Sequence, residues 1–286
     1  RINNLAWMSD ETKVEAHDKL VKISPQIGYP NKWRDYSSIT ISKDSLLQNI
    51  RSTNQYTHAD SVSEIGNEPD KELWWYAPQT VNASYSPTEN RIVFPAGYLQ
   101  APNFQIGVDD AANYGAIGVT IGHEIGHGFD DEGSKNDGDG VLRNWWTTGD
   151  REKFKARTEK LVAQFNKFCP FDDACLNGEL SLGENIGDLA GLVVAYDAYQ
   201  LSLKGKEAPV IDGLTGDERF MLSFAQAGKG KWRDDFVRTL IVTDPHVPDM
   251  YRVLGPLQNF DLFYKTYDVK EGDGMYLPPE ERVNIW

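Results

Sequence analysis

The spacing of apolar residues predicts a mainly helical chain that contains one short β-hairpin. Helical spacing begins after Ser9, a good N-cap residue, and the helix that it predicts ends at the turn 28–30. A second helical stretch covers 46–52 and extends further. Between 80 and 94, apolar and polar residues alternate on either side of a turn at 87–90, which is typical of a hairpin.

The second half of the chain has helical spacing in five further segments. We expect helices at about 113–129, 150–168, 181–196, 217–228 and 232–240. Four of the glycines in the first of these segments lower its helix propensity. We therefore expect them to let another backbone approach closely; they are Gly115, Gly118, Gly122 and Gly126.

The helix expected at 113–129 contains the sequence His123-Glu124-Ile125-Gly126-His127. Residues four apart in an α-helix differ by roughly 40° around the axis and about 6 Å along it, so both imidazoles leave one face and can bind one metal ion. Glu124 lies one step round from the pair and can reach a metal-bound water without being a ligand. The pattern predicts a zinc hydrolase, although five residues alone also arise by chance.

A catalytic zinc ion usually takes three protein ligands and leaves a fourth position open. In the helix that Ser181 is expected to cap, Glu184 and Asp188 are four residues apart and share one face. We interpret Glu184 as the third ligand and Asp188 as the acceptor of a hydrogen bond from a ligand histidine. The alternative, two solvated acids on a surface helix, fits poorly with the apolar and glycine-rich residues around them.

These motifs resemble those of the neprilysin and endothelin-converting-enzyme peptidases. Residues 123–130 are HEIGHGFD and residues 183–188 are GENIGD, as in that family. Residues 81–97 are similar to its substrate-binding edge strand and the segment after it, and 243–253 to the segment with its transition-state histidine and substrate-binding arginine. The resemblance covers essentially the whole chain. It implies an α+β fold, a mainly helical, thermolysin-like zinc metallopeptidase with a small β-sheet whose edge strand binds substrate.

The resemblance also implies a reaction. It implies one zinc ion per chain, with His123, His127 and Glu184 as ligands, and attack of zinc-bound water on a peptide bond with Glu124 as the base. Asp188 would support the ligands. The family's preference implies an endopeptidase that cleaves peptides on the amino side of large hydrophobic residues.

Further residues receive substrate-facing roles from the same resemblance. His246 would donate a hydrogen bond to the tetrahedral oxyanion, and Arg252 would bind substrate carbonyls. Asn82 and the backbone of Ala83 would align the peptide as an extra strand on the sheet edge.

The residues alone leave two further roles open, those of Asp130 and Asp244. Asp130 follows His127 by three positions and is either its hydrogen-bond partner or an exposed acid at a helix end. Asp244 could orient His246, but a lone histidine in a loop is ordinarily structural. The loop 130–140 lacks the regular spacing of a calcium loop, and we expect a solvated turn there.

Family members are usually more than twice as long as this chain, which corresponds to their C-terminal part. We expect a helical segment at 1–78 that leads into a catalytic domain at 79–286. The chain begins with Arg1 and not with Met, which suggests a processed product whose N-terminal part exists as a separate chain. The alternatives are a catalytic half that needs that part, a non-catalytic peptide-binding module, and a zinc-stabilised structural domain.

Composition and cysteine content indicate which partners and which cellular compartment to expect. A net charge of −14 argues against nucleic acid as a partner, and no apolar run is long enough to span a membrane. The two cysteines, Cys169 and Cys175, enclose a tight loop that a disulfide could close; free thiols are the alternative. A disulfide predicts an oxidising compartment. Animal members of the family carry a cysteine close to the C-terminal tryptophan, and this chain has none near Trp286. We therefore expect a bacterial-type protein that is secreted or periplasmic.

Overall fold

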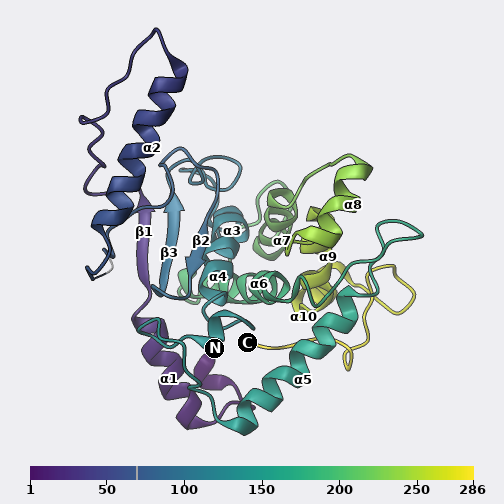
Figure 1. Cartoon of the computed structure of the whole chain (residues 1–286). Coiled ribbons are helices and arrows are strands. Elements are labelled where there is room, and N and C mark those ends of the chain that lie inside the picture. Colours follow the sequence, from purple (N-terminus) through teal and green to yellow (C-terminus); the bar gives the residue numbers. More distant parts are fainter. Residues whose placement is uncertain (69) are drawn as a thin grey trace.

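The computed structural model describes residues 1–68 and 70–286. Figure 1 shows a small sheet beside a group of helices, with α4 (Val119–Gly126) and α6 (Leu182–Ser202) at the centre. α1 (Asp10–Val21) and α5 (Thr148–Phe165) lie together at one end, and α2 (Leu46–Ser63) projects beyond the sheet. This arrangement confirms the mainly helical α+β fold expected from the sequence.

The sheet has three strands in the order β1-β3-β2 (Figure 1). β2 (Ser84–Ser86) and β3 (Arg91–Pro95) form the antiparallel hairpin predicted from the alternating residues. β1 (Ser24–Gly28) pairs with β3 in parallel, so the long excursion that includes α2 connects the two strands. Among the described residues, β2 therefore stands at an edge of the sheet and pairs on one side only, as the resemblance implied.

The first helix begins where it was predicted but ends earlier. Ser9 caps α1 by accepting a hydrogen bond from the backbone N–H of Thr12. The helix ends at Val21 and β1 follows, so the prediction of helix up to the turn 28–30 was wrong. β1 has the sequence SPQIG, which contains a single large apolar residue and therefore gives almost no strand pattern.

The helix with the histidine motif consists of three consecutive segments. They are α3 (Asp110–Asn113), a π-helical turn named η2 (Tyr114–Gly118), and α4. Wide turns of this kind are inserted in helices mostly near functional sites. The helix predicted at 113–129 is thus present, but it starts at Asp110 and ends at Gly126, with His127 as its C-cap.

Glycines let α4 and α6 lie almost backbone to backbone. A Cβ atom on Gly122 would stand 2.9 Å from Cα of Gly191, and one on Gly191 would stand 2.4 Å from the carbonyl oxygen of Val119. A Cβ on Gly115 would similarly meet the carbonyl oxygen of Phe220 at 2.1 Å. The close approach of another backbone is thus confirmed for Gly115 and Gly122, and it brings His123 next to α6, whereas Gly118 has only ordinary side-chain contacts outside its own helix.

Three apolar clusters fix the helices and the sheet around this central pair. The largest packs α1, α5 and the C-terminal residues around a group of aromatic rings in mutual contact: Trp7, Trp145, Trp146, Phe154 and Trp286. The second joins α6 to α7 (Gly216–Ala227) and α9 (Asp249–Gln258). The third lies between the sheet and η2, around Phe94 and Ile117.

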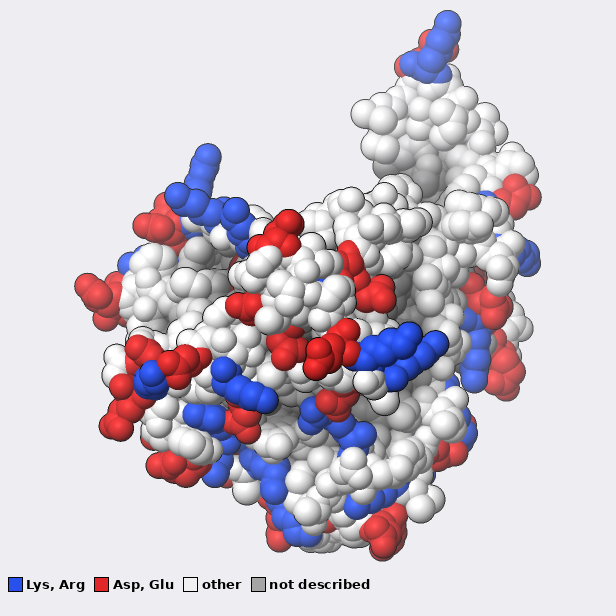
Figure 2. All heavy atoms as spheres, turned by 180° about the vertical axis from the view of Figure 1, so that it is seen from behind, with Lys and Arg blue, Asp and Glu red and all other residues white. Residues whose placement is uncertain are grey.

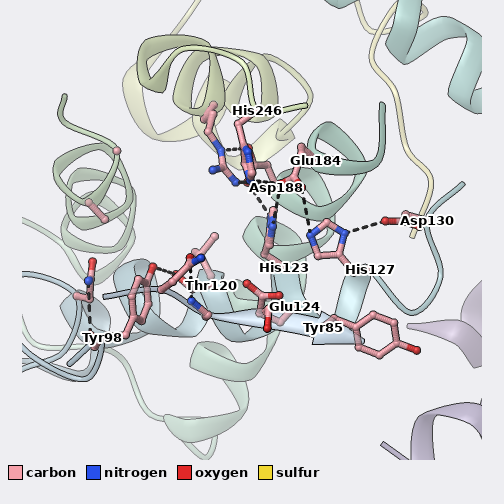
Figure 3. Close-up of a pocket in the computed structure, with 18 of the residues that line it drawn as sticks. Tyr85, Tyr98, Thr120, His123, Glu124, His127, Asp130, Glu184, Asp188 and His246 are labelled. Carbon is pink, nitrogen blue, oxygen red and sulfur yellow. Dashed lines mark hydrogen bonds and ion pairs between the residues drawn. The ribbon is translucent and has the colours of Figure 1, made fainter. Parts of the chain in front are cut away.

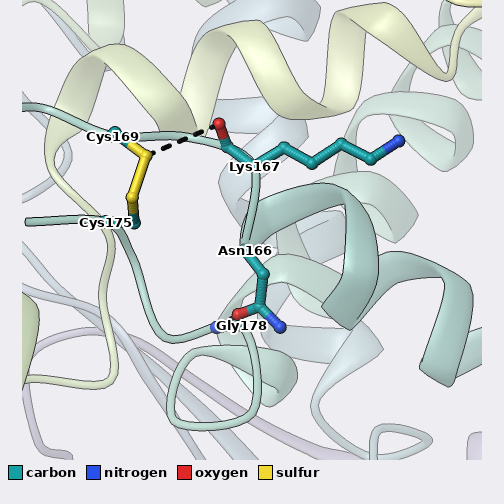
Figure 4. The surroundings of a disulfide bond; sticks show 5 residues. All are labelled: Asn166, Lys167, Cys169, Cys175 and Gly178. Carbon is teal, nitrogen blue, oxygen red and sulfur yellow. Dashed lines mark hydrogen bonds between the residues drawn. A yellow bond between two sulfur atoms is a disulfide. The ribbon is translucent and has the colours of Figure 1, made fainter. Parts of the chain in front are cut away.

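The remaining elements close the helical side of the molecule. α8 (Asp234–Thr243) and α10 (Asp261–Tyr267) complete it, together with the short 3₁₀ turns η1 (Ile2–Asn4) and η3 (Gly133–Lys135). The loop after α5 is closed by a disulfide between Cys169 and Cys175, as predicted from their spacing (Figure 4).

The face of the molecule seen in Figure 2 carries no large basic patch. In Figure 2, Lys and Arg side chains alternate with Asp and Glu across the face opposite to that of Figure 1. Acidic residues outnumber basic ones, 43 to 29. Within the described residues, none of the helices combines the length and the apolar character that crossing a membrane requires.

Candidate active site

A cavity of about 540 Å³ opens between the edge strand β2, the helices α4 and α6, and the ends of α7 and α9. Most of the side chains singled out in the sequence line it, as Figure 3 shows. They are Asn82, Ala83, His123, Glu124, His127, Asp130, Glu184, Asp188, His246 and Arg252. Asp244 lies behind His246 and does not line the cavity.

The three predicted ligands meet in this cavity. One ligand atom from each of His123, His127 and Glu184 lies within 4.8 Å of the other two. Nε2 of His123 is 3.3 Å from Oε2 of Glu184, and Nε2 of His127 is 3.7 Å from Oε1. The two imidazole nitrogens and the carboxylate oxygen therefore point to one place, and three ligand atoms arranged in this way are typical of a catalytic zinc site.

Each histidine is held by a second carboxylate at its far ring nitrogen. Nδ1 of His123 lies 2.8 Å from Oδ1 of Asp188, and Nδ1 of His127 lies 2.7 Å from Oδ2 of Asp130. These contacts favour the tautomer that leaves Nε2 free to bind a metal. Asp188 thus lies in contact with the far ring nitrogen of His123, and Asp130 is a hydrogen-bond partner of His127 and not an exposed acid.

About half of the loop 130–140 is buried, including Asp130, so the expectation of a solvated turn there was wrong. Asp130 Oδ1 accepts hydrogen bonds from the backbone N–H groups of Glu132 and Gly133. The fully buried Lys19 of α1 donates from Nζ to the carbonyl oxygens of Gly133 and Asn136, both at 2.7 Å. Sequence inspection missed this role because Lys19 shares its helix with several exposed charged residues.

The electrostatics of the ligand group favour a bound cation. Burial lowers the pKa of His123, but Asp188 and Glu184 more than offset it and leave it raised. Burial alone would raise the pKa of the Glu184 carboxyl group. The contacts of Glu184 with His123 and His246 outweigh burial and hold this pKa well below its usual value. Oε2 of Glu184 is buried and accepts no hydrogen bond from the described residues, although His123 and His246 lie 3.3 and 3.1 Å away. These residues fit a divalent zinc ion.

Glu124 faces the same cavity without belonging to the ligand group (Figure 3). It is buried, and burial raises the pKa of its carboxyl group, whereas the neighbouring His123 and His127 act in the opposite direction. A carboxylate with a raised pKa is suited to take up a proton from water and release it again.

His246 and Arg252 approach the ligands from the opposite wall. Nε2 of His246 lies 3.1 Å from Oε2 of Glu184, and its Nδ1 lies 2.8 Å from Oδ1 of Asp244, which also accepts the backbone N–H of His246. Arg252 donates to both oxygens of Asp188, at 2.8 and 2.6 Å. The bidentate pair fixes the orientation of Asp188.

Asn82 and Ala83 immediately precede β2 and lie at the rim of the cavity. Oδ1 of Asn82 accepts the backbone N–H of Ala83, and the exposed side chain reaches Tyr76. Several residues that line the cavity were not singled out in the sequence, among them Tyr98 and Thr120. Tyr98 follows β3 in a loop, and no pattern in the sequence brings it next to α4.

Comparison with known proteins agrees with this geometry. The family profile described as "Peptidase family M13" matches residues 82–283. The chain is 36% identical to human neprilysin and to the endothelin-converting enzyme homolog of Locusta migratoria, and spans 40% of each. All of the chain superimposes on the zinc metalloprotease Zmp1 of Mycobacterium tuberculosis in complex with an inhibitor, with 46% identity and a TM-score of 0.96. It also superimposes on PepO of Lactobacillus rhamnosis, with 34% identity and a TM-score of 0.90. The chain covers 44% of each of these two structures.

The resemblance noted in the sequence is therefore confirmed over the whole chain, although the chain spans only about two fifths of these curated relatives. The family profile and the superposed structures both cover the segments that line the cavity from residue 82 onward. The chain belongs to peptidase family M13, together with neprilysin and the endothelin-converting enzymes.

Proposed function

We propose that this chain is the catalytic part of a zinc endopeptidase that hydrolyses peptides. The observation that carries the proposal is the convergence of His123, His127 and Glu184 on one point, within 4.8 Å, in a cavity that Glu124 also faces. A structural zinc site normally closes its coordination with four protein ligands. Among the described residues the group contains three, which favours catalysis over a structural role.

His123, His127 and Glu184 would hold the zinc ion. When bound, zinc supplies a Lewis acid that makes water acidic enough to lose a proton near neutral pH. Glu124 accepts that proton as the water attacks the peptide carbonyl, and then delivers it to the leaving amine.

The opposite wall stabilises the charge that develops on the substrate. His246, oriented by Asp244, donates a hydrogen bond to the carbonyl oxygen as it becomes negative. Arg252 binds a substrate carbonyl while it holds Asp188. The peptide pairs with the unpaired side of β2, where Asn82 and the Ala83 backbone align it. This mode suits extended peptides, and we propose cleavage on the amino side of large hydrophobic residues.

The whole protein is proposed to include an N-terminal region, present as a separate chain or joined to this one. The named relatives are more than twice as long, since the chain spans 38–40% of them. A non-catalytic peptide-binding half is the alternative. The disulfide between Cys169 and Cys175 supports an extracytoplasmic location, because such bonds persist in oxidising compartments.

The test combines zinc content with cleavage of a quenched fluorescent peptide, for the chain alone and together with the N-terminal region. We expect about one zinc per chain, and turnover that falls at least ~10²-fold in Glu124→Gln while zinc is retained. Glu184→Gln should lose zinc. Full activity of Glu124→Gln would refute the assigned base, and unchanged zinc in Glu184→Gln would refute the assigned ligand.

A further inference from the structure

We propose that Tyr98 makes this site selective for a hydrogen-bonding side chain after the scissile bond, so that tyrosine is preferred to phenylalanine at that position. The inference rests on the proposed function and adds a substrate class to it. It starts from the part of the cavity that is lined by the loop after β3, the helix α4 and the end of α7, here named the recess.

Most walls of the recess are apolar. Val119 and Phe224 are buried members of one apolar cluster, and Val253 packs against the same cluster from α9. A Cβ on Gly228 would meet Cγ2 of Val253 at 2.5 Å, so α7 and α9 are in close contact where they enclose the recess. These walls suit the body of a large apolar side chain.

The side of the recess toward β3 is polar. The hydroxyl of Tyr98 lies 3.2 Å from Oγ1 of Thr120, as Figure 3 shows, and both residues line the cavity. The ring of Tyr98 packs edge-on against Phe94, with centroids 6.3 Å apart. The amide of Asn103 donates to the carbonyl oxygen of Tyr98, and the carbonyl of Asn103 accepts the N–H of Ile117. The hydroxyl pair is therefore held by the sheet and by η2.

Two hydroxyl groups that share one hydrogen bond keep one further proton to donate and lone pairs to accept with. A phenol that enters the recess can satisfy them, whereas a phenyl ring would displace water and leave them without a partner. A site built to bind a substrate hydroxyl discriminates strongly against the analogue that lacks it.

The position in the substrate follows from α4. Thr120 precedes Glu124 by one helical turn, so the two side chains lie on one face of the helix. Glu124 delivers its proton to the leaving amine. The residue that contributes this amine therefore has its side chain beside Glu124, at the entrance of the recess.

The experiment compares two peptides that differ only by Tyr or Phe after the scissile bond, with cleavage sites checked by mass spectrometry. We expect wild-type kcat/KM to favour the Tyr peptide, and Tyr98→Phe to lower the Tyr-to-Phe ratio about fivefold to tenfold. Thr120→Val should also lower the Tyr-to-Phe ratio of kcat/KM. Tyr196→Phe, which removes a hydroxyl bonded to Asp217 outside the cavity, is the matched control and should leave the ratio unchanged.

Binding provides a second readout that does not require turnover. In zinc-loaded Glu124→Gln protein, calorimetry should show tighter binding of the Tyr peptide than of the Phe peptide. Adding Tyr98→Phe should reduce this difference in dissociation constants, as it reduces the difference in kcat/KM. A ratio that does not change in Tyr98→Phe, or a wild-type preference for the Phe peptide, overturns the inference. If neither peptide is cleaved but the binding ratio still depends on Tyr98, the recess is supported and the proposed function fails.

Discussion

At the scale of single residues, several charged groups are buried for structural reasons and not for catalysis. Asp150 is 1% exposed at the start of α5, and its Oδ2 accepts hydrogen bonds from the backbone N–H of Ser9 and the hydroxyl of Thr12. Burial raises its pKa, but these bonds and the contact with Lys153 outweigh it and hold the pKa far below the usual value. The carboxylate therefore joins α5 to the cap of α1.

Asp150→Asn should lower the free energy of unfolding at pH 7 by about 2–3 kcal/mol, because the amide cannot accept all of these hydrogen bonds and stays buried. The wild-type pKa is lower in the folded than in the unfolded state, so the unfolded state binds more protons. Its stabilisation is thus complete above about pH 4 and is lost as the pH falls toward the folded pKa.

Urea unfolding between pH 7 and pH 3 measures both effects. The variant should lose less stability than wild type on acidification. Glu152→Gln, an exposed acid on the same helix, is the control and should change little at any pH. Equal pH dependence in Asp150→Asn and wild type would contradict the role given to this carboxylate.

At the scale of elements, the geometry of the ligand group depends on the spacing of α4 and α6. Gly191→Ala would place a methyl group 2.4 Å from the carbonyl oxygen of Val119 and 2.9 Å from the backbone nitrogen of His123. The helices must separate, which moves His123 relative to Glu184. Although alanine is the better helix former, we expect a net loss of about 1–3 kcal/mol of stability together with weaker zinc binding.

Thermal unfolding and zinc titration of Gly191→Ala check this expectation. Gly149→Ala is the matched control, since a Cβ at Gly149 in α5 has no neighbour within 4 Å. It should be neutral or slightly stabilising and leave zinc affinity unchanged. Wild-type zinc affinity in Gly191→Ala would show that the close helix contact does not position the ligands.

The elements also show what the sequence could and could not predict. The helices carrying the ligands, and their glycines, were predictable because helical periodicity and the spacing of His123, His127, Glu184 and Asp188 are local. β1 was not, because its five residues form a strand only through parallel pairing with β3, a non-local contact. The burial of the loop after α4 depends on Lys19, more than a hundred residues earlier. Tyr98 likewise reaches the cavity through tertiary packing alone.

At the scale of the whole molecule, α2 differs from every helix near the site. Its 18 residues include none that is buried, and Leu46, Leu47 and Ile50 are 75%, 59% and 47% exposed. An isolated helix of this length is only marginally stable in water, since packing supplies most helical stability in proteins. The base of the excursion, in contrast, is fixed by the buried Arg91, which donates to the carbonyl oxygens of Lys71 and Leu73.

We therefore expect amide hydrogen exchange in α2 to be at least ~10³-fold faster than in the buried helix α6, because only local opening is needed to expose its amides. Peptide-resolved exchange of this chain at pH 7 measures the difference. If the proposed N-terminal region covers the apolar residues of α2, its presence should slow exchange there and leave α6 unchanged. Protection of α2 equal to that of α6 in the chain alone would mean that the helix is stable without packing, and that its exposed leucines and isoleucine need no partner.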